Sequence, residues 1–240
     1  MTRVLCCSAS IIALLSLVGA ARAARADELA DPYLGVELML GFSGDMDAET
    51  GAVRVGGAGL TVSEGAQADF SPEVGIGGGV IYMHPLLAYF ALGGRFAVQS
   101  WRSSDSQGTG GRNLAFELAA VPQLRLPLSA AIELYLSLPV GITLDLLNEL
   151  DESASLSFAG VMAGASLDAD VGVGWNLAGL IGVRFALASS FGLFAEAGYA
   201  LHQVSHDLHF QVGLGAASTE AIADLDVSWS QIALDIGAYF

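Results

Sequence analysis

The sequence predicts an all-β protein, specifically an eight-stranded antiparallel up-and-down transmembrane β-barrel. Three observations predict this fold: long segments in which apolar and polar residues alternate, connections that alternate between long and short, and an N-terminus typical of secretion. The alternation is clearest from Ile132 to Leu146, where every even-numbered residue is aliphatic. A period of two indicates a strand, and the run is long enough for the roughly 9–11 tilted residues that cross a bilayer.

The N-terminus resembles a secretory signal peptide. Arg3 precedes an apolar run from Ile11 to Val18, and small residues allow cleavage after Ala23 or Ala26. We therefore expect residues 1–26 to be removed and the barrel to occupy residues 32–240. Both cysteines lie in the removed part, so the mature chain would have neither a disulfide nor a thiolate metal site. We expect no cofactor.

The charge of the chain argues against one class of partner. The formal net charge is −16, and loss of the three arginines in residues 1–26 takes it to −19. The chain contains no lysine at all. A nucleic-acid partner requires clustered cations, so none is expected.

Eight segments are predicted to be strands, and each has one largely apolar face. The fifth of them is the Ile132 to Leu146 run, and Pro122 and Pro139, which lie inside strands, predict bulges because each removes a donor from the ladder. The eight segments are residues 33–42, 73–83, 89–101, 114–126, 132–146, 171–187, 191–202 and the last stretch, which ends at Phe240.

The connections give the predicted barrel its orientation. Long acidic or Gly/Ala-rich loops are expected at residues 43–71, 148–170 and 203–225. Tight turns are expected at His84-Pro85, at 127–130 and at 188–190. Outer-membrane barrels have short periplasmic turns and longer extracellular loops, which puts both termini in the periplasm.

The end of the chain carries a family resemblance. The last strand alternates through Ile236 and finishes on Tyr239 and Phe240, and the strand before it contains the run from Phe194 to Tyr199. These features resemble the small OmpA/OmpX/OmpW-like barrels of Gram-negative bacteria. The resemblance implies an outer-membrane location in contact with outer-membrane lipid and lipopolysaccharide, and recognition of the last strand by the outer-membrane assembly machinery. We expect no peptidoglycan-binding domain, because the chain stops at the barrel.

The lumen of such a barrel is narrow enough for side chains to fill it. Nine inward-facing charged residues, three cations among six acids, are therefore predicted to form an ion-paired network, because an unpaired charge is costly to bury. The alternative is a porin-like conduit for small ions or solutes. The nine residues are Glu37, Arg95, Glu117, Arg125, Glu133, Asp145, Arg184, Glu196 and Asp235.

We expect a non-catalytic structural or surface-interaction protein. Divalent cations at the acidic outer loops are an open alternative partner. A zinc site at His202, His206 and His209 is a weak alternative, because on a strand His209 points away from the other two. A lipid-modifying enzyme that uses Ser205 with His202 or His206 is a further alternative, but the spacing does not suit the membrane rim. We expect neither a metal nor catalytic residues.

The predicted topology can be tested on intact cells. Epitope tags placed within residues 43–71, 148–170 or 203–225 should be reached by antibody, because these segments are predicted to lie outside the cell. Tags in the turn at 127–130 should be reached only after the outer membrane is opened. Labelling of that turn on intact cells would reverse the orientation.

Overall fold

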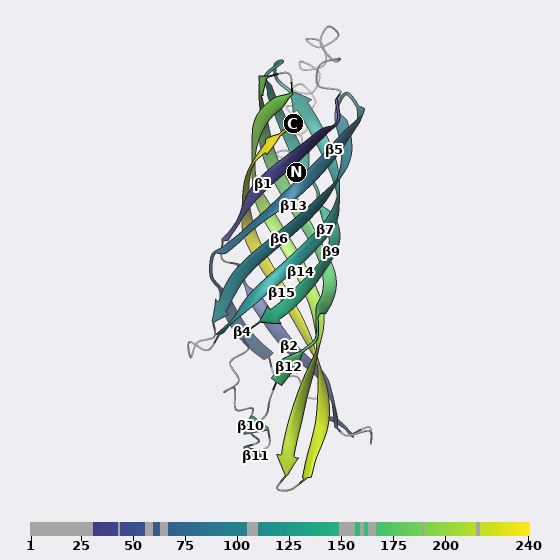
Figure 1. Ribbon diagram of the computed structural model, residues 1–240, viewed down its shortest axis with the longest axis vertical. Coiled ribbons are helices and arrows are strands. Elements are labelled where there is room, and N and C mark those ends of the chain that lie inside the picture. The colour runs from purple at the N-terminus through teal and green to yellow at the C-terminus, as the bar shows by residue number, and fades with distance from the viewer. Residues whose placement is uncertain are drawn as a thin grey trace, which may run out of the picture.

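The structure is a computed structural model of the chain, shown as a ribbon in Figure 1. It describes residues 31–42, 44–55, 60–62, 67–104, 110–148, 157–158, 161–162, 167–188, 190–214 and 217–240. The predicted signal peptide lies outside these residues. In the part of the chain that is described, no helix combines the length and the apolar character needed to cross a membrane.

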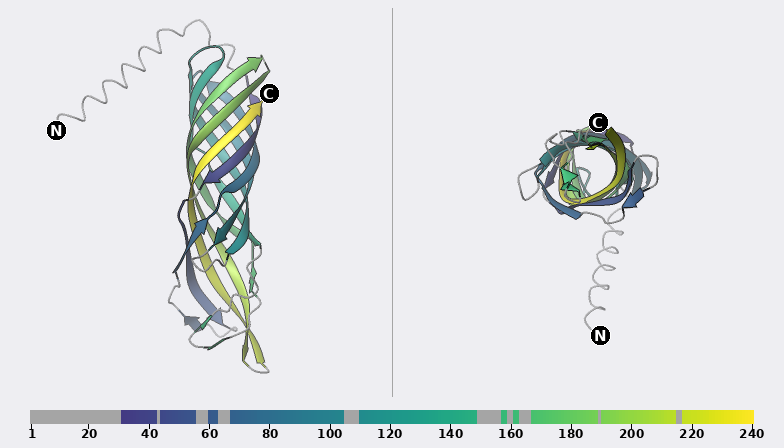
Figure 2. Two further views of the ribbon diagram at one scale, coloured as in Figure 1. Left: turned by 90° about the vertical axis from the view of Figure 1, so that its left-hand side faces the viewer. Right: turned by 90° about the horizontal axis from the view of Figure 1, so that it is seen from below.

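The described strands form a closed antiparallel ring of eight, as the sequence predicted (Figure 2). β1 pairs with β5 on one side and with β15 on the other, which closes the barrel. β8 and β9 share one position in the ring, because both pair with β7 and β13. The ring strands are β1 (Tyr33–Phe42), β5 (Gly75–Leu87), β6 (Phe90–Ser104), β7 (Gly110–Pro127), β8 (Ile132–Ser137), β9 (Val140–Asn148), β13 (Gly172–Ala188), β14 (Phe191–Leu214) and β15 (Ala217–Tyr239).

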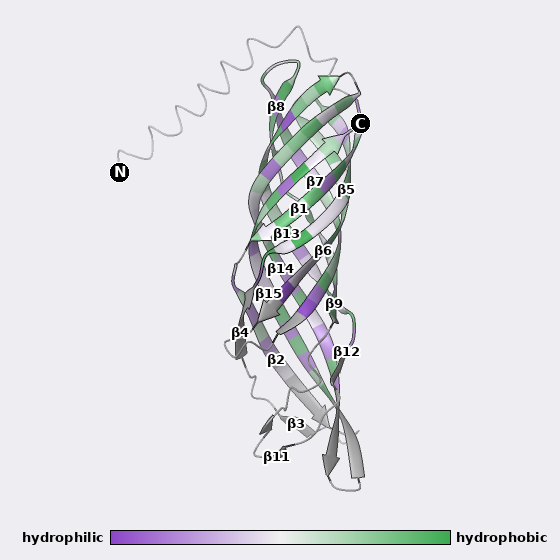
Figure 3. Ribbon diagram, turned by 60° about the vertical axis from the view of Figure 1, so that its left-hand side comes forward, coloured by the Kyte–Doolittle hydropathy of each residue, from purple (hydrophilic) through white to green (hydrophobic). Residues whose placement is uncertain are grey.

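Apolar side chains cover the outside of the barrel and polar ones lie inside it. On β1 the Leu38 side chain points outward and is 52% exposed, whereas its neighbour Glu37 points inward and is 7% exposed. The same alternation is visible along the other barrel strands in Figure 3. The facing predicted from the Ile132 to Leu146 run is confirmed, because its even-numbered residues are outward and Glu133 and Asp145 are buried.

The two strand prolines do not produce bulges, which corrects the expectation from the sequence. β6 and β7 keep one register through Pro122, and β7 keeps one register with β8 and β9 across Pro139. The Pro122 carbonyl accepts from the Leu138 amide at 3.0 Å, and the Pro139 carbonyl accepts from the Ala178 amide at 2.9 Å. Each proline therefore removes its own donor and leaves the ladder in register.

The predicted turn at His84-Pro85 is also wrong. Both residues belong to β5, and the chain reverses at Ala88 and Tyr89 instead. The pairing of β5 with β1 ends at Met83, so Pro85 lies where β5 is an edge strand. An edge position tolerates a missing N–H, which explains why proline does not end the strand there.

All three of the predicted long loops contain strands. β14 and β15 stay paired from Gly192 and Tyr239 to Leu214 and Ala217, straight through the expected loop at 203–225, and Figure 1 shows them continuing past the rest of the barrel. The expected loop at 43–71 contributes strands to the same extension. We call this part the outer sheet; it comprises the distal parts of β14 and β15 with β2 (Met46–Val55), β3 (Leu60–Val62), β4 (Gln67–Pro72) and β12 (Leu167–Ala169).

The third predicted loop, at 148–170, is only partly described. Besides β12, it contains a separate two-stranded pair formed by β10 (Ser157–Phe158) and β11 (Val161–Met162). Most of the remaining residues of this segment lie outside the described part of the chain.

The outward apolar face can be tested with matched arginine variants. Leu38→Arg places a charge in the middle of the apolar face of β1. In lipid it should lower the free energy of unfolding by about 2–4 kcal/mol. Ser228→Arg places the same charge on the exposed polar face of the outer sheet and should change the stability by less than about 0.5 kcal/mol. Urea titration of the heat-modifiable folded form in lipid vesicles measures both. Equal losses would contradict the assigned boundary of the apolar face.

Candidate functional site

The lumen is the part of the barrel where charged side chains gather. Eight of the nine charged residues singled out in the sequence are buried there, and the Glu117 side chain retains 12% exposure. Strands from different parts of the ring bring them into two ion-pair clusters and two carboxylate–histidine pairs. They therefore meet in separate groups at different heights of the lumen.

The group nearest the short turns is the Glu133 cluster, formed by Glu133, Arg125 and Arg184. Arg184 on β13 is directly opposite Glu133 on β8, and its Nη2 lies 2.9 Å from Glu133 Oε1. Arg125 on β7 donates from Nε and Nη2 to the same carboxylate over 2.8–3.1 Å. Charge-assisted bonds of this kind are the strong ones in proteins. The cluster nevertheless holds two cations and one anion.

Two tyrosine rings face the second cation of this cluster. The Arg184 guanidinium lies 4.5 Å from the centre of the Tyr33 ring and 5.1 Å from that of Tyr239. The two rings also contact each other, with centroids 5.3 Å apart. Since the face of an aromatic ring attracts cations, the tyrosines from the first and last strands stabilise the excess positive charge.

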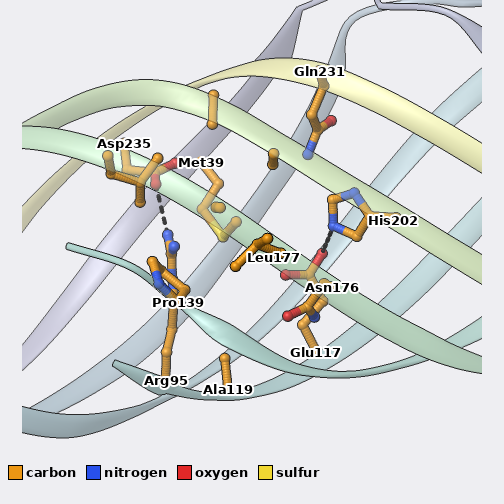
Figure 4. A pocket seen from close by; sticks show the side chains of 14 residues that line it. Met39, Arg95, Glu117, Ala119, Pro139, Asn176, Leu177, His202, Gln231 and Asp235 are labelled. Carbon is orange, nitrogen blue, oxygen red and sulfur yellow. Dashed lines mark hydrogen bonds and ion pairs between the residues drawn. The ribbon is translucent and has the colours of Figure 1, made fainter. Parts of the chain in front are cut away.

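The Arg95 cluster lies further into the lumen and consists of Arg95, Glu37, Glu196 and Asp235. Arg95 Nε is 2.5 Å from Glu37, and Nη2 is 2.6 Å from Asp235 and 3.9 Å from Glu196. One oxygen from each carboxylate lies within 4.8 Å of the others. Figure 4 shows Arg95 reaching across to Asp235. One guanidinium thus faces three carboxyl groups, so this cluster holds an excess of acid.

An apolar layer fills the lumen on the short-turn side of the Arg95 cluster. Tyr135 is also buried in the lumen; its partner across the sheet is Gly182, where a Cβ would lie 2.2 Å from Tyr135 Cζ. Small residues opposite large ones are how narrow barrels close their interior. The buried members of the layer are Tyr33, Ile81, Met83, Ala91, Val121 and Phe194.

A second apolar layer closes the outer end. Trp101 and Trp229 pack against each other with ring centroids 5.1 Å apart, and both are about 5% exposed or less. Their neighbours in this layer are Met46, Ala48, Ala115, Val204 and Val227. The polar groups around Arg95 lie between the tryptophan layer and the apolar layer on the short-turn side.

A cavity of about 20 Å³ remains between the two layers. Arg95 and Asp235 line one side of it and Glu117 and His202 line the other, as Figure 4 shows. A water molecule needs roughly 10–15 Å³ by this measure, so the cavity has room for about one. The interior is therefore packed with side chains along most of its length.

The three histidines contact three different carboxylates. His202 Nε2 lies 3.0 Å from Glu117 and the ring stacks on Trp229, with centroids 4.6 Å apart. His206 lies 3.2 Å from Asp145, and His209 lies 3.3 Å from Asp170. His202 and His206 point inward and His209 outward, as the strand alternation predicted. A zinc site made by all three is therefore inconsistent with the structure.

The side chains of the alternative enzyme site lie on opposite faces of one strand. Ser205 is exposed and donates a hydrogen bond to Asp226, whereas its neighbour His206 is buried in the lumen. A hydroxyl nucleophile and its base must be within hydrogen-bond reach of each other. Ser205 and the lumen histidines therefore do not form the proposed relay.

Sequence reasoning did not include several polar lumen residues in the candidate site. Gln99 and Gln231 hydrogen-bond each other over 2.9–3.3 Å, and Asn176 donates to Thr143 at 3.0 Å. His206 was considered only as a metal ligand or a base, because the strand was expected to end at residue 202. The signal was present, since the inward positions continue without a break through Val204, His206 and Leu208.

The chain is similar to solved outer-membrane barrels. It is 11% identical to the outer membrane protein OprG from Pseudomonas aeruginosa, with a TM-score of 0.50, covering 86% of this chain and 96% of that one. Outer membrane protein AlkL is 16% identical with a TM-score of 0.36, covering 86% and 89%. The attachment invasion locus protein Ail of Yersinia pestis is 13% identical with a TM-score of 0.29, covering 82% and 98%.

The likeness to OprG concerns the fold, which is that of a small outer-membrane β-barrel. No model of a known protein family matches the sequence, and no curated protein sequence matches it either. What the lumen and the outer sheet do must therefore be argued from this chain's own residues.

The Glu133 cluster can be tested by removing its only anion. Glu133→Gln leaves two buried guanidinium groups without their anion. It should lower the free energy of unfolding by about 3–5 kcal/mol, the usual cost of breaking a buried pair. Glu73→Gln, at an exposed position on the same barrel, should cost less than about 0.5 kcal/mol. Urea midpoints of the folded form in detergent provide the comparison. Matching midpoints would show that the cluster carries little stability.

Proposed function

We propose that this protein is a non-catalytic outer-membrane protein whose barrel anchors the outer sheet and whose role is structural or surface interaction. The observation that carries this proposal is the combination of a filled lumen with barrel strands that continue well beyond the apolar belt. A filled lumen gives a transported solute no path, and an extended sheet gives a partner a surface.

The change in outward-facing residues along β14 supports a surface role. Tyr199 and Leu201 face outward within the apolar belt. The next outward positions, at every second residue, are occupied by Gln203, Ser205 and Asp207. On β15 the residues opposite Gln203 and Ser205 are the polar Ser228 and Asp226, whereas on β13 they are Trp175 and Val173. Such a face suits water and lipid headgroups, whereas the belt suits hydrocarbon.

The charge of this face supports a partnership with lipopolysaccharide through divalent cations. Asp226 lies directly opposite Glu49, and Asp207 directly opposite Asp224. Like charges directly opposite each other destabilise a sheet, so a cation between them would be favourable. Divalent cations that bind carboxylate oxygens could bridge these groups to anionic lipid.

The position of the chain ends supports a periplasmic location for both termini. The amide and carbonyl of Leu34 pair with those of Phe240, so the start of the first barrel strand and the end of the last one lie together at the short-turn end of the barrel. There Ile236 and Phe240 face outward, Tyr239 turns toward Tyr33, and Phe240 contacts Phe191. We propose that this apolar last strand is the segment recognised during outer-membrane assembly.

A narrow conduit for ions is the second candidate. Six carboxyl groups against three guanidinium groups leave the lumen acidic, and the cavity beside Arg95 offers space for water. These features favour cations over anions if any path exists. The two apolar layers oppose a continuous path.

Planar-bilayer recording distinguishes the two candidates. The wild-type protein should show no steady conductance, because side chains fill a lumen of this strand number. Tyr135→Ala opens space within the lumen and should increase any cation leak. Tyr199→Ala removes an equally large side chain from the lipid-facing surface and should leave the bilayer sealed. Reproducible single-channel steps from the wild type would favour the conduit.

A further inference from the structure

The outer end of the lumen contains a histidine and an aspartate that face each other without forming a hydrogen bond. His206 on β14 and Asp145 on β9 are 2% and 0% exposed. His206 Nε2 lies 3.2 Å from Asp145 Oδ2, yet the atoms are not aligned for a hydrogen bond. Among the described residues, none provides a hydrogen-bond partner for either carboxylate oxygen of Asp145 or for Nε2 of His206.

The other ring nitrogen fixes which atom of His206 is available. Its Nδ1 lies 3.2 Å from the backbone carbonyl oxygen of Asp170. A carbonyl oxygen can only accept, so Nδ1 carries the proton and the neutral ring presents a lone pair at Nε2. That lone pair faces the lone pairs of a carboxylate. Something positive must lie between them, either a second proton on the ring or a cation.

The backbone holds the two groups in this arrangement. Gly172 on β13 lies directly between them, paired with Asp145 on one side and adjacent to His206 on the other. A Cβ on Gly172 would lie 2.3 Å from His206 Cε1, so only glycine lets the ring lie across β13 and reach Asp145. A histidine whose Nδ1–H donates to a carbonyl and whose Nε2 is free is the usual arrangement of a metal ligand.

A third polar side chain lies on the same inward face. Asp145 is directly opposite Ala115 on β7, and Asn113 lies two residues further along β7 on the same inward face. Asn113 is 2% exposed, and its Nδ2 has no hydrogen-bond partner among the described residues. An amide can be turned by 180° to exchange nitrogen for oxygen, which would offer Oδ1 to a ligand.

We propose that His206 and Asp145, with Asn113 beside them, form a binding site for a divalent transition-metal ion such as Zn²⁺. Two ligand atoms at about 2.0–2.2 Å from a tetrahedral ion lie roughly 3.3–3.6 Å apart, close to the separation seen here. One imidazole nitrogen with carboxylate and amide oxygens suits zinc and its neighbours in the first transition row. The ion would connect β9 to β14 across β13 at the base of the outer sheet. This site is separate from a three-histidine site and from cation bridging on the outer face.

The test uses Co²⁺ as a spectroscopic substitute for zinc, bound to the full mature chain refolded in detergent after treatment with chelator. The wild type should bind one equivalent, with visible ligand-field absorption typical of nitrogen and oxygen ligands, and Zn²⁺ should displace it. His206→Gln and Asp145→Asn should each weaken binding at least about tenfold. Folding of each variant is checked by heat-modifiable migration.

Three controls separate this site from other carboxylates and histidines. His209→Gln removes an outward-facing histidine that also lies beside an aspartate, Asp47→Asn removes an exposed acid of the outer sheet, and Glu117→Gln changes the other buried carboxylate–histidine pair. All three should bind Co²⁺ as the wild type does. Absence of a Co²⁺ spectrum in the folded wild type would overturn the proposal and leave a protonated His206 paired with Asp145. Equal loss in His209→Gln, or unchanged binding in both site variants, would also overturn it.

Discussion

The need to pair every backbone group in hydrocarbon is the constraint on which this structure depends. Water is absent from the bilayer core, so a strand that crosses it must have a neighbour on both sides. The pairing of β1 with β15 meets this requirement, since it removes the last two open edges of the ring. Pro122 and Pro139 show how few backbone hydrogen bonds are given up. Each proline lacks an N–H donor, yet its carbonyl still accepts a hydrogen bond from the next strand.

Closure also decides what the interior can be. Because the apolar faces of the strands are turned to lipid, the chain must build its core from the other face, where charges and amides dominate. Those groups are expensive to bury alone, so Glu133 is held between two arginines and Arg95 between three carboxyl groups. An apolar layer that contains Tyr33 and Phe194 and another that contains Trp101 and Trp229 then lie on either side of the Arg95 cluster.

The sequence predicts whether a side chain faces the lumen or the lipid better than it predicts the height of that side chain, which is its position along the barrel axis. A period of two assigns inside and outside directly, which is why the facing of β1 and of the Ile132 to Leu146 run is correct. Height depends on the stagger between strands, so the sequence could not say which carboxylate meets which arginine. Outside the lipid the outward face becomes polar as well, and the alternation that marks a strand weakens. For that reason β14 and β15 were expected to end near the membrane, and His206 was not included in the predicted charged network of the lumen.

The length of β14 and β15 links the lumen to the outer sheet. At about 3.3 Å per residue, the 24 residues of β14 span roughly 80 Å along the strand, well over the ~30 Å of hydrocarbon. The same two strands carry Glu196 and Asp235 of the Arg95 cluster, and their pairing continues without a break to Leu214 and Ala217. Because the ladder is unbroken, a displacement of the outer part of this hairpin would be transmitted along β14 and β15 to the buried ion pairs of the Arg95 cluster.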